Sequence, residues 1–145
     1  MQEEGKASIE ERFEEATRKH QSGELDRAEL IYKELLREVP ENPKINYLLG
    51  CIFLHHDIRE GAIKHFETSL QGEEDLSCLK ALISAYYRNK DYQLILDLFK
   101  QREGLLRNDV QVMTSMGESL IEVGLLDEAE SVFRELLSLF GESAQ

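Results

Sequence analysis

The sequence feature that most constrains the fold of this chain is a unit that recurs four times. Each copy has a turn residue, an apolar residue five positions later that is small in three copies, and an aromatic residue four positions after that. The four sets are Gly23, Ala28 and Tyr32; Asp57, Ala62 and Phe66; Lys90, Ile95 and Phe99; and Gly124, Ala129 and Phe133. The middle positions are 34, 33 and 34 residues apart. A fixed period of this length is typical of repeat architectures, in which each copy is one supersecondary unit.

Each of the last three copies also shows an upstream half with a helical pattern. A large apolar residue, a small or branched one and another large one follow in order, as in Leu49, Gly50 and Phe53 or in Met116, Gly117 and Leu120. Apolar residues three and four positions apart form one face of a helix. Each unit is therefore two helices joined by a tight polar turn. The expected helices span 9–21 and 25–38, 43–56 and 59–71, 76–89 and 92–104, and 110–122 and 126–139.

These features resemble the tetratricopeptide repeat (TPR) family over about residues 9–143. The period, the Leu49-Gly50 pair, the recurring alanines and aromatics, and Pro40 after the first unit carry the resemblance. It implies an all-α fold: a right-handed superhelical solenoid of four helix-turn-helix units, eight helices in all. We expect a flexible lead-in over 1–8, a single domain over 9–143 and a tail at 144–145. The units are expected at 9–42, 43–75, 76–109 and 110–143.

The formal net charge of −12 narrows the classes of partner. Nucleic-acid binding draws much of its affinity from neutralising phosphates with basic side chains, and anionic membrane surfaces also attract bases. No apolar run approaches the roughly 20 residues of a membrane span, and the first residues lack the apolar core of a secretory signal. Two cysteines make no disulfide framework. We therefore expect a cytoplasmic protein with no nucleic-acid partner and no membrane insertion.

The resemblance implies that the first helix of each unit lines a concave groove. The side chains expected to face the groove are Phe13, Thr17, His20, Lys44, Tyr47, Cys51, Leu54, His55, Lys80, Ser84, Tyr87 and Arg88. The unit at 76–109 is the only one with a net positive charge. We therefore expect the groove to hold a peptide segment with acidic and apolar side chains. The alternative is that these residues form an ordinary solvated helix face.

Enzymatic interpretations find little support in the sequence. Cys51 and His55 lie four positions apart, which is a ligand-like spacing on a helix, but two ligands are too few for a metal site. A Cys–His nucleophile pair would also need an orienting third group and an oxyanion site. No Gly-rich phosphate loop is present in the sequence. We therefore expect no enzyme, no metal and no cofactor.

The end of the last unit carries a run of large apolar residues, Leu136, Leu137, Leu139 and Phe140. A repeat array exposes apolar surface at its last unit unless something covers it. This predicts self-association through the C-terminal edge. The preferred function is a non-enzymatic protein–protein interaction module, a scaffold or adaptor. The alternatives are a recognition arm of a larger bacterial enzyme such as a glycosyltransferase, and a self-assembling oligomeric scaffold.

Overall fold

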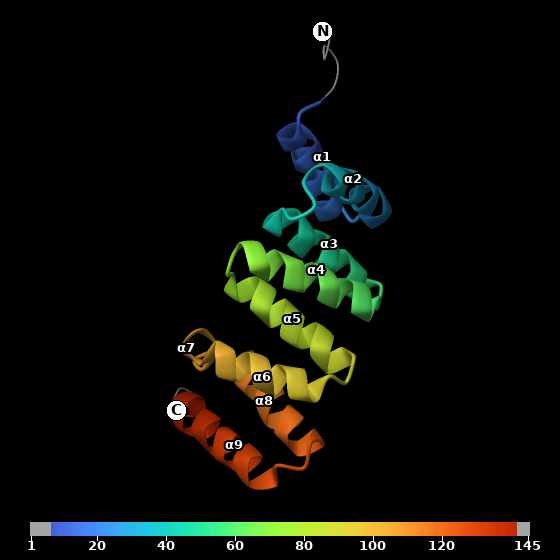
Figure 1. The fold of residues 1–145 in the computed structure, drawn as a ribbon. Coiled ribbons are helices and arrows are strands. Elements are labelled where there is room, and N and C mark those ends of the chain that lie inside the picture. The colour runs from blue at the N-terminus through green and yellow to red at the C-terminus, as the bar shows by residue number, and fades with distance from the viewer. Residues whose placement is uncertain (1–6, 142–145) are drawn as a thin grey trace. The chain divides into compact units, whose positions relative to one another are not determined.

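A computed structural model of the chain describes residues 7–141, and within that range it contains helices and no strand. The helices are α1 (Ile9–Gln21), α2 (Leu25–Glu38), α3 (Pro43–His55), α4 (Arg59–Gly72), α5 (Leu76–Arg88), α6 (Tyr92–Gln101), α7 (Glu103–Leu106), α8 (Val110–Glu122) and α9 (Leu126–Phe140) (Figure 1). The all-α expectation is confirmed. Most of the lead-in expected over 1–8, and the tail expected at 144–145, lie outside the described residues. Within the described range no helix is long and apolar enough to cross a bilayer.

The chain divides into two compact units, and the boundary falls within α5, after Cys78. The first unit contains α1 to α4 and the first three residues of α5, and the second contains the remainder of α5 and α6 to α9. The division into four repeat units within one domain stays a prediction.

The core of the first unit is built where small residues let helices approach. Ala16 on α1 and Ala28 on α2 are completely buried. Tyr32 on α2 is also fully buried, and its ring lies 6.2 Å from that of Phe13 on α1. Leu35, Ile45, Leu49 and Ile52 complete the same cluster from α2 and α3. Alternating large and small side chains thus fill the space between the three helices, as close packing of protein interiors requires.

The small residue of α3 packs against an aromatic ring of α4. A Cβ atom added to Gly50 would lie 2.6 Å from Phe66 Cε1, and its three nearest atoms would all belong to that ring. The same contact recurs between α8 and α9, where a Cβ on Gly117 would lie 2.6 Å from Phe133 Cζ. In these two repeats the aromatic ring of the second helix therefore packs directly on a glycine of the first helix.

Four helical hairpins turn in the same way. Their turn residues all have positive φ: 84° at Gly23, 59° at Asp57, 62° at Lys90 and 86° at Gly124. In each turn the following amide donates to a carbonyl five residues back, as from Asp91 to Tyr86 at 2.9 Å. This is the bond pattern of a Schellman cap, which requires a left-handed residue at the helix end. The turn position of the repeat is thus set by backbone conformation.

The helix bounds agree with the expected ones to within one residue at all but one place. The helix expected over 92–104 ends at Gln101, and the single-turn helix α7 follows it. The apolar stripe of α6 ends with Phe99, because the next two positions on that face are charged. Arg102 leaves the helical region with φ −126° and ψ 29°, and Leu106 then becomes fully buried. Burying this leucine compensates for the broken helix.

Candidate functional site

A hollow in the first unit lies beside the first turns of α3. It has a volume of about 330 Å³ and is lined from α3, α4 and the segment that leads into α5. Its lining residues are Pro43, Lys44, Tyr47, Leu48, Ser69, Glu73, Asp75, Ser77 and Cys78. Two of these, Lys44 and Tyr47, are residues that the sequence predicted for the groove. We call this the α3–α4 hollow.

The region of the α3–α4 hollow combines a positive charge, aromatic rings and carboxylates. The Lys44 ammonium lies 5.6 Å from the centre of the Phe13 ring of α1, within the range of a cation–π contact. The Tyr47 ring lies 6.0 Å from that of Phe66. Lys44 and Tyr47 thus line the hollow, and Phe13 contacts Lys44 beside it. Glu73 and Asp75 place carboxylates in the same hollow.

Burial favours the neutral forms of two polar groups in this region, the Tyr47 hydroxyl and the Cys51 thiol. It raises the pKa of Tyr47 to about 12, with the neighbouring Cys51 as a further cause. Burial also raises the pKa of the Cys51 thiol, whose hydrogen-bond partner is Tyr47. A protonated, half-buried thiol is a poor nucleophile. Cys51 is therefore suited to packing and hydrogen bonding in this site.

The remaining predicted residues of the first unit make contacts within the fold. The Thr17 hydroxyl donates to the Phe13 carbonyl at 2.9 Å. His20 Nδ1 lies 3.3 Å from the Tyr32 hydroxyl, and burial lowers the pKa of His20. Leu54 is half-buried. The exposed His55 stacks edge to face on His56, with ring centres 5.4 Å apart. These contacts leave Phe13, Lys44 and Tyr47 as the members that border a hollow or its rim.

A smaller hollow in the second unit lies between α5 and α8. Its volume is about 140 Å³, and its walls include two predicted groove residues, Lys80 and Ser84. Gln111, Val112 and Ser115 face them from α8. Side chains of α5 and α8 therefore line the same hollow. We call this the α5–α8 hollow.

Lys80 has a partner that the sequence did not indicate. Its ammonium lies 2.9 Å from Asp109 Oδ2. Asp109 also caps α8, because its Oδ1 accepts a hydrogen bond from the Val112 amide at 3.0 Å. Burial opposes the charge on Asp109, but these two bonds outweigh it and lower its pKa. A peptide carboxylate that binds Lys80 must therefore compete with Asp109.

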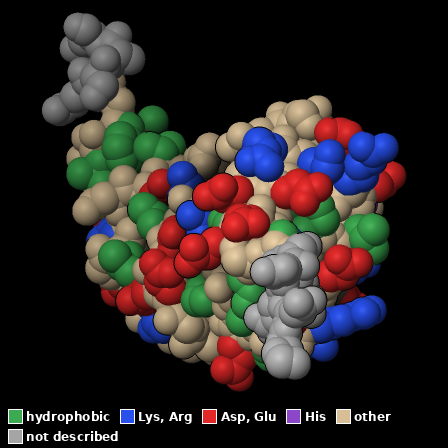
Figure 2. Space-filling model, turned by 90° about the horizontal axis from the view of Figure 1, so that it is seen from above, with side chains coloured by type: hydrophobic (Ala, Val, Ile, Leu, Met, Phe, Trp, Pro, Cys, Tyr) green, Lys and Arg blue, Asp and Glu red, His purple; other side chains and the backbone are tan. Residues whose placement is uncertain are grey.

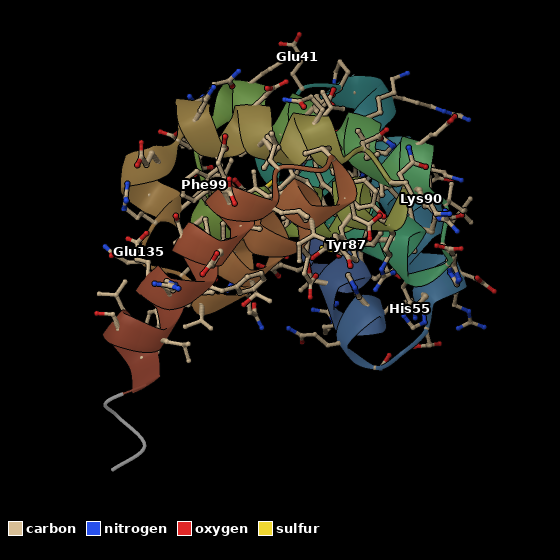
Figure 3. The ribbon with its side chains drawn as sticks, turned by 90° about the horizontal axis from the view of Figure 1, so that it is seen from below. Glu41, His55, Tyr87, Lys90, Phe99 and Glu135 are labelled. Carbon is tan, nitrogen blue, oxygen red and sulfur yellow. The ribbon has the colours of Figure 1, made fainter. Side chains whose placement is uncertain are left out.

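Tyr87 and Arg88 lie at the C-terminal end of α5 (Figure 3), and both are exposed. The Tyr87 ring packs edge to face on Tyr92, with centres 5.7 Å apart. A hydrogen bond with Glu118 of α8 raises the pKa of Tyr87. Tyr87 thus has an exposed ring, and its hydroxyl is already hydrogen-bonded to Glu118.

Sequence reasoning missed the acidic side of the α3–α4 hollow. Glu73 and Asp75 fall between the helices expected over 59–71 and 76–89, and in the structure they line the hollow together with Lys44. A signal was available, since a chain that leaves α4 must pass the start of α3. No group of three or more His, Cys, Asp or Glu side chains able to hold a metal ion occurs among residues 7–141.

Comparisons with known proteins agree with the repeat. The family model of the PPR repeat matches residues 77–101 and 112–139. No curated protein matches the sequence significantly. Among solved structures, YrrB, described as a TPR protein with an unusual peptide-binding site, has a TM-score of 0.84 at 24% identity, over 96% of this chain and 72% of YrrB. MamA of MSR-1 has a TM-score of 0.83 at 18% identity, over 98% of this chain and 82% of MamA.

A second MamA structure, of AMB-1, has a TM-score of 0.84 at 19% identity, covering 91% of this chain and 73% of that one. The family-model match and the similar solved structures indicate the same class of fold. This chain has the fold of TPR-like helical-repeat proteins, and its all-α repeat architecture follows from that fold.

Proposed function

We propose that this chain is a non-enzymatic interaction scaffold that binds a peptide segment of another protein along the first helices of its repeats. The observation that carries the proposal is the α3–α4 hollow, where Lys44 and Tyr47 offer a charge and an aromatic surface side by side. The described peptide-binding site of YrrB, a protein of similar fold, supports it. Fold-level likeness alone does not name a task, so the argument stands on the hollow.

The chemistry of the α3–α4 hollow indicates which kind of peptide it would bind. Aromatic and basic side chains are the usual anchors of protein interfaces, and the rings of Phe13 and Tyr47 supply apolar area beside the Lys44 ammonium. Glu73 and Asp75 repel a uniformly acidic ligand from the α3–α4 hollow. The best ligand is therefore a largely apolar segment with an isolated carboxylate that reaches Lys44. We expect affinities on the order of micromolar, because one shallow site must also order the peptide.

A selection experiment tests the proposal. Phage-displayed random 12-residue peptides are selected on the intact chain, and the selected peptides are titrated against variants. Lys44→Glu should weaken binding about tenfold, because it turns an attractive charge into a repulsive one. The double variant Lys80→Glu with Arg88→Glu reports in the same way on the basic residues of α5, of which Lys80 lines the α5–α8 hollow.

The matched control is Lys100→Glu, which makes the same charge change at an exposed position of the second helix α6. Its affinity should equal that of the wild type. If the wild type, Lys44→Glu and the double variant bind the selected peptides with equal affinity, the peptide does not bind on the first helices.

The PPR match raises a second candidate, since repeats of that family read single-stranded RNA, one base for each helical repeat. The charge distribution disfavours it, because residues 110–141 contain six carboxylates and one arginine. Figure 2 shows acidic side chains spread over one face with basic ones set among them. Titration of a labelled 16-nucleotide random RNA decides the matter: RNA binding at physiological salt would replace the peptide proposal.

Two further roles remain open to direct measurement. Attachment to a larger enzyme as its recognition arm would appear as a longer reading frame in the gene. Self-assembly would appear as a mass above that of one chain in sedimentation. Both are compatible with peptide binding by the first helices.

A further inference from the structure

An exposed tyrosine near the end of α5 lies beside two carboxylates of α8. Tyr87 (Figure 3) is 37% exposed, and its ring packs edge to face on Tyr92. A hydrogen bond to Glu118 is the largest cause of the raised pKa of Tyr87, and the charge of Glu122 contributes to it. Ile121, next to Glu122 in the chain, is 47% exposed. We call Tyr87, Glu118, Ile121 and Glu122 the tyrosine–glutamate patch.

The patch continues the contact between α5 and α8 that forms the α5–α8 hollow. Ser84 of α5 and Ser115 of α8 both line that hollow. Tyr87 and Glu118 each follow three positions later, which is one turn further along the same side of each helix. Glu122 follows Glu118 by four positions and shares its face of α8. The ring and both carboxylates therefore border one region of the surface.

The negative charge of the patch is unfavourable for α8 itself. Like charges four positions apart on a helix repel each other, and the C-terminal end of a helix favours cations over anions. Glu118 and Glu122 have both disadvantages, because Glu122 is the last residue of α8. The last turns of α1, α3 and α5 each contain a basic residue, whereas that of α8 contains none. A bound cation would relieve both effects.

The chain does not itself supply this cation within the part that the structure describes. Among residues 7–141, neither glutamate of the patch forms an ion pair with a lysine, arginine or histidine. Glu118 accepts a hydrogen bond from Tyr87, but an ionised carboxylate has about four acceptor positions. Both carboxylates can therefore accept hydrogen bonds from a cation outside the chain.

The exposed ring of the patch favours one kind of cation. A guanidinium group is planar, stacks on aromatic faces and donates two parallel hydrogen bonds to a carboxylate, whereas an ammonium group acts as a compact point charge. A long basic side chain also lays its methylene stem along apolar surface, which Ile121 provides. Ring, carboxylates and apolar side chain together match an arginine.

We propose that the tyrosine–glutamate patch binds an arginine side chain of the peptide segment that the first helices hold. The guanidinium stacks on Tyr87 and donates to the carboxylates of Glu118 and Glu122, while its stem lies on Ile121. This inference rests on the proposed function for the source of the arginine. It adds a requirement for a basic side chain that the α3–α4 hollow does not impose.

The probe is the tripeptide acetyl-Leu-Arg-Leu-amide, with two matched peptides that have citrulline or lysine in place of arginine. Citrulline keeps the shape of arginine and removes its charge. Each peptide is titrated into the intact chain and followed by backbone amide chemical shifts. The arginine peptide should shift the amides of Glu118, Ile121 and Glu122 with a dissociation constant on the order of millimolar. The lysine peptide should bind about threefold more weakly, and the citrulline peptide should cause no saturable shift.

The test variant is Glu118→Gln with Glu122→Gln, which should abolish the saturable shifts of the arginine peptide. Its matched control is Glu10→Gln with Glu14→Gln, which makes the same charge change at exposed positions four apart on α1. The control should bind like the wild type. Tyr87→Leu keeps both carboxylates and should weaken the arginine peptide about threefold, because the aromatic face is lost.

Three results overturn the inference. The arginine peptide causes no saturable shift at the patch of the wild type. It binds the double glutamine variant of α8 as tightly as the wild type. The citrulline or the lysine peptide binds the wild type as tightly as the arginine peptide.

The tripeptide titration is separable from the proposed function, because Lys44→Glu should leave it unchanged. If the tripeptides fail while phage-selected peptides still bind through Lys44, only the arginine site is wrong. If the arginine tripeptide binds as expected while no longer peptide can be selected on the chain, the proposed function fails and the arginine site remains.

Discussion

Single residues set the packing of this chain at two recurring positions, the glycine of a first helix and the residue of the hairpin turn. Gly50 and Gly117 each lie under an aromatic ring that leaves no room for a Cβ. Gly23 and Gly124 have open space around them, and their positive φ is what favours glycine. The same residue type is thus required for contact at one position and for conformation at the other.

Gly50→Ala should lower the free energy of unfolding by about 1–3 kcal/mol, because the rigid Phe66 ring must shift to admit a methyl group. Gly50→Leu should cost at least as much. Urea denaturation followed by circular dichroism measures the change. Gly104→Ala is the control, since a Cβ at this helical position meets no atom within 4 Å, and it should be neutral or stabilising. A Gly50→Ala variant as stable as the parent would show that the ring contact is wrong.

Lys90→Gly should raise the free energy of unfolding by about 0.5–1 kcal/mol, because Lys90 holds a left-handed conformation with φ 62° (Figure 3). Gly124→Ala should lower it by about 1 kcal/mol at the equivalent turn. The two substitutions should change the free energy of unfolding in opposite directions only if backbone conformation determines which residue each turn favours. Two changes of the same sign in thermal melts would contradict this account.

At the scale of elements, helices pair through interlocking side chains and begin at side-chain caps. Ser8, Asn42 and Asp109 each accept a hydrogen bond from the amide three positions on, at the starts of α1, α3 and α8. Such caps satisfy amides that a helix leaves without partners. Asp109 has a second task, because its ion pair with Lys80 ties the start of α8 to α5.

Asp109→Ala should lower the free energy of unfolding by about 1–2 kcal/mol, through loss of the cap and the ion pair together. Asp109→Asn keeps the cap and should recover most of that loss. The two variants are compared by urea denaturation at pH 7. If asparagine is as harmful as alanine, the cap contributes little and the ion pair to Lys80 carries the effect.

The period and the apolar faces were enough to predict the helices, since both are local properties of the sequence. The break of α6 before α7 was missed, because burial of Leu106 depends on tertiary packing. Gly50 was recognised as a repeat position, but its contact with the Phe66 ring depends on how α3 packs against α4. For the site, the helical period could only suggest which first-helix positions face a groove. The Lys80–Asp109 pair and the acidic wall at Glu73 depend on the course of the loops, which no periodicity encodes.

At the scale of the whole molecule, two half-buried histidines couple stability to pH. His65 Nδ1 lies 2.9 Å from Asn46 Oδ1, and the Asn46 amide group donates to the carbonyls of Pro40 and Asn42. The amide orientation leaves its oxygen to accept, so His65 carries its proton on Nδ1. Burial, with Lys64 and Lys33 nearby, lowers the pKa of His65, and burial lowers that of His20.

The free energy of unfolding should therefore fall as the pH drops below about 6.5, the ordinary histidine value. In that range the unfolded chain binds more protons than the folded chain, so stability rises with pH and levels off above 6.5. Urea denaturation from pH 5 to pH 8 measures the slope. His65→Asn with His20→Asn should flatten it, and an unchanged slope in this double variant would assign the pH dependence to other groups.

The central claim is that polypeptide binds on the first helices of the repeats. Backbone amide chemical shifts during titration with a phage-selected peptide test it most directly. The account predicts that the largest changes gather around Lys44 and Tyr47 on α3 and around Lys80 and Ser84 on α5. Changes centred on the second helices, around Leu30 of α2 or Lys100 of α6, would contradict it.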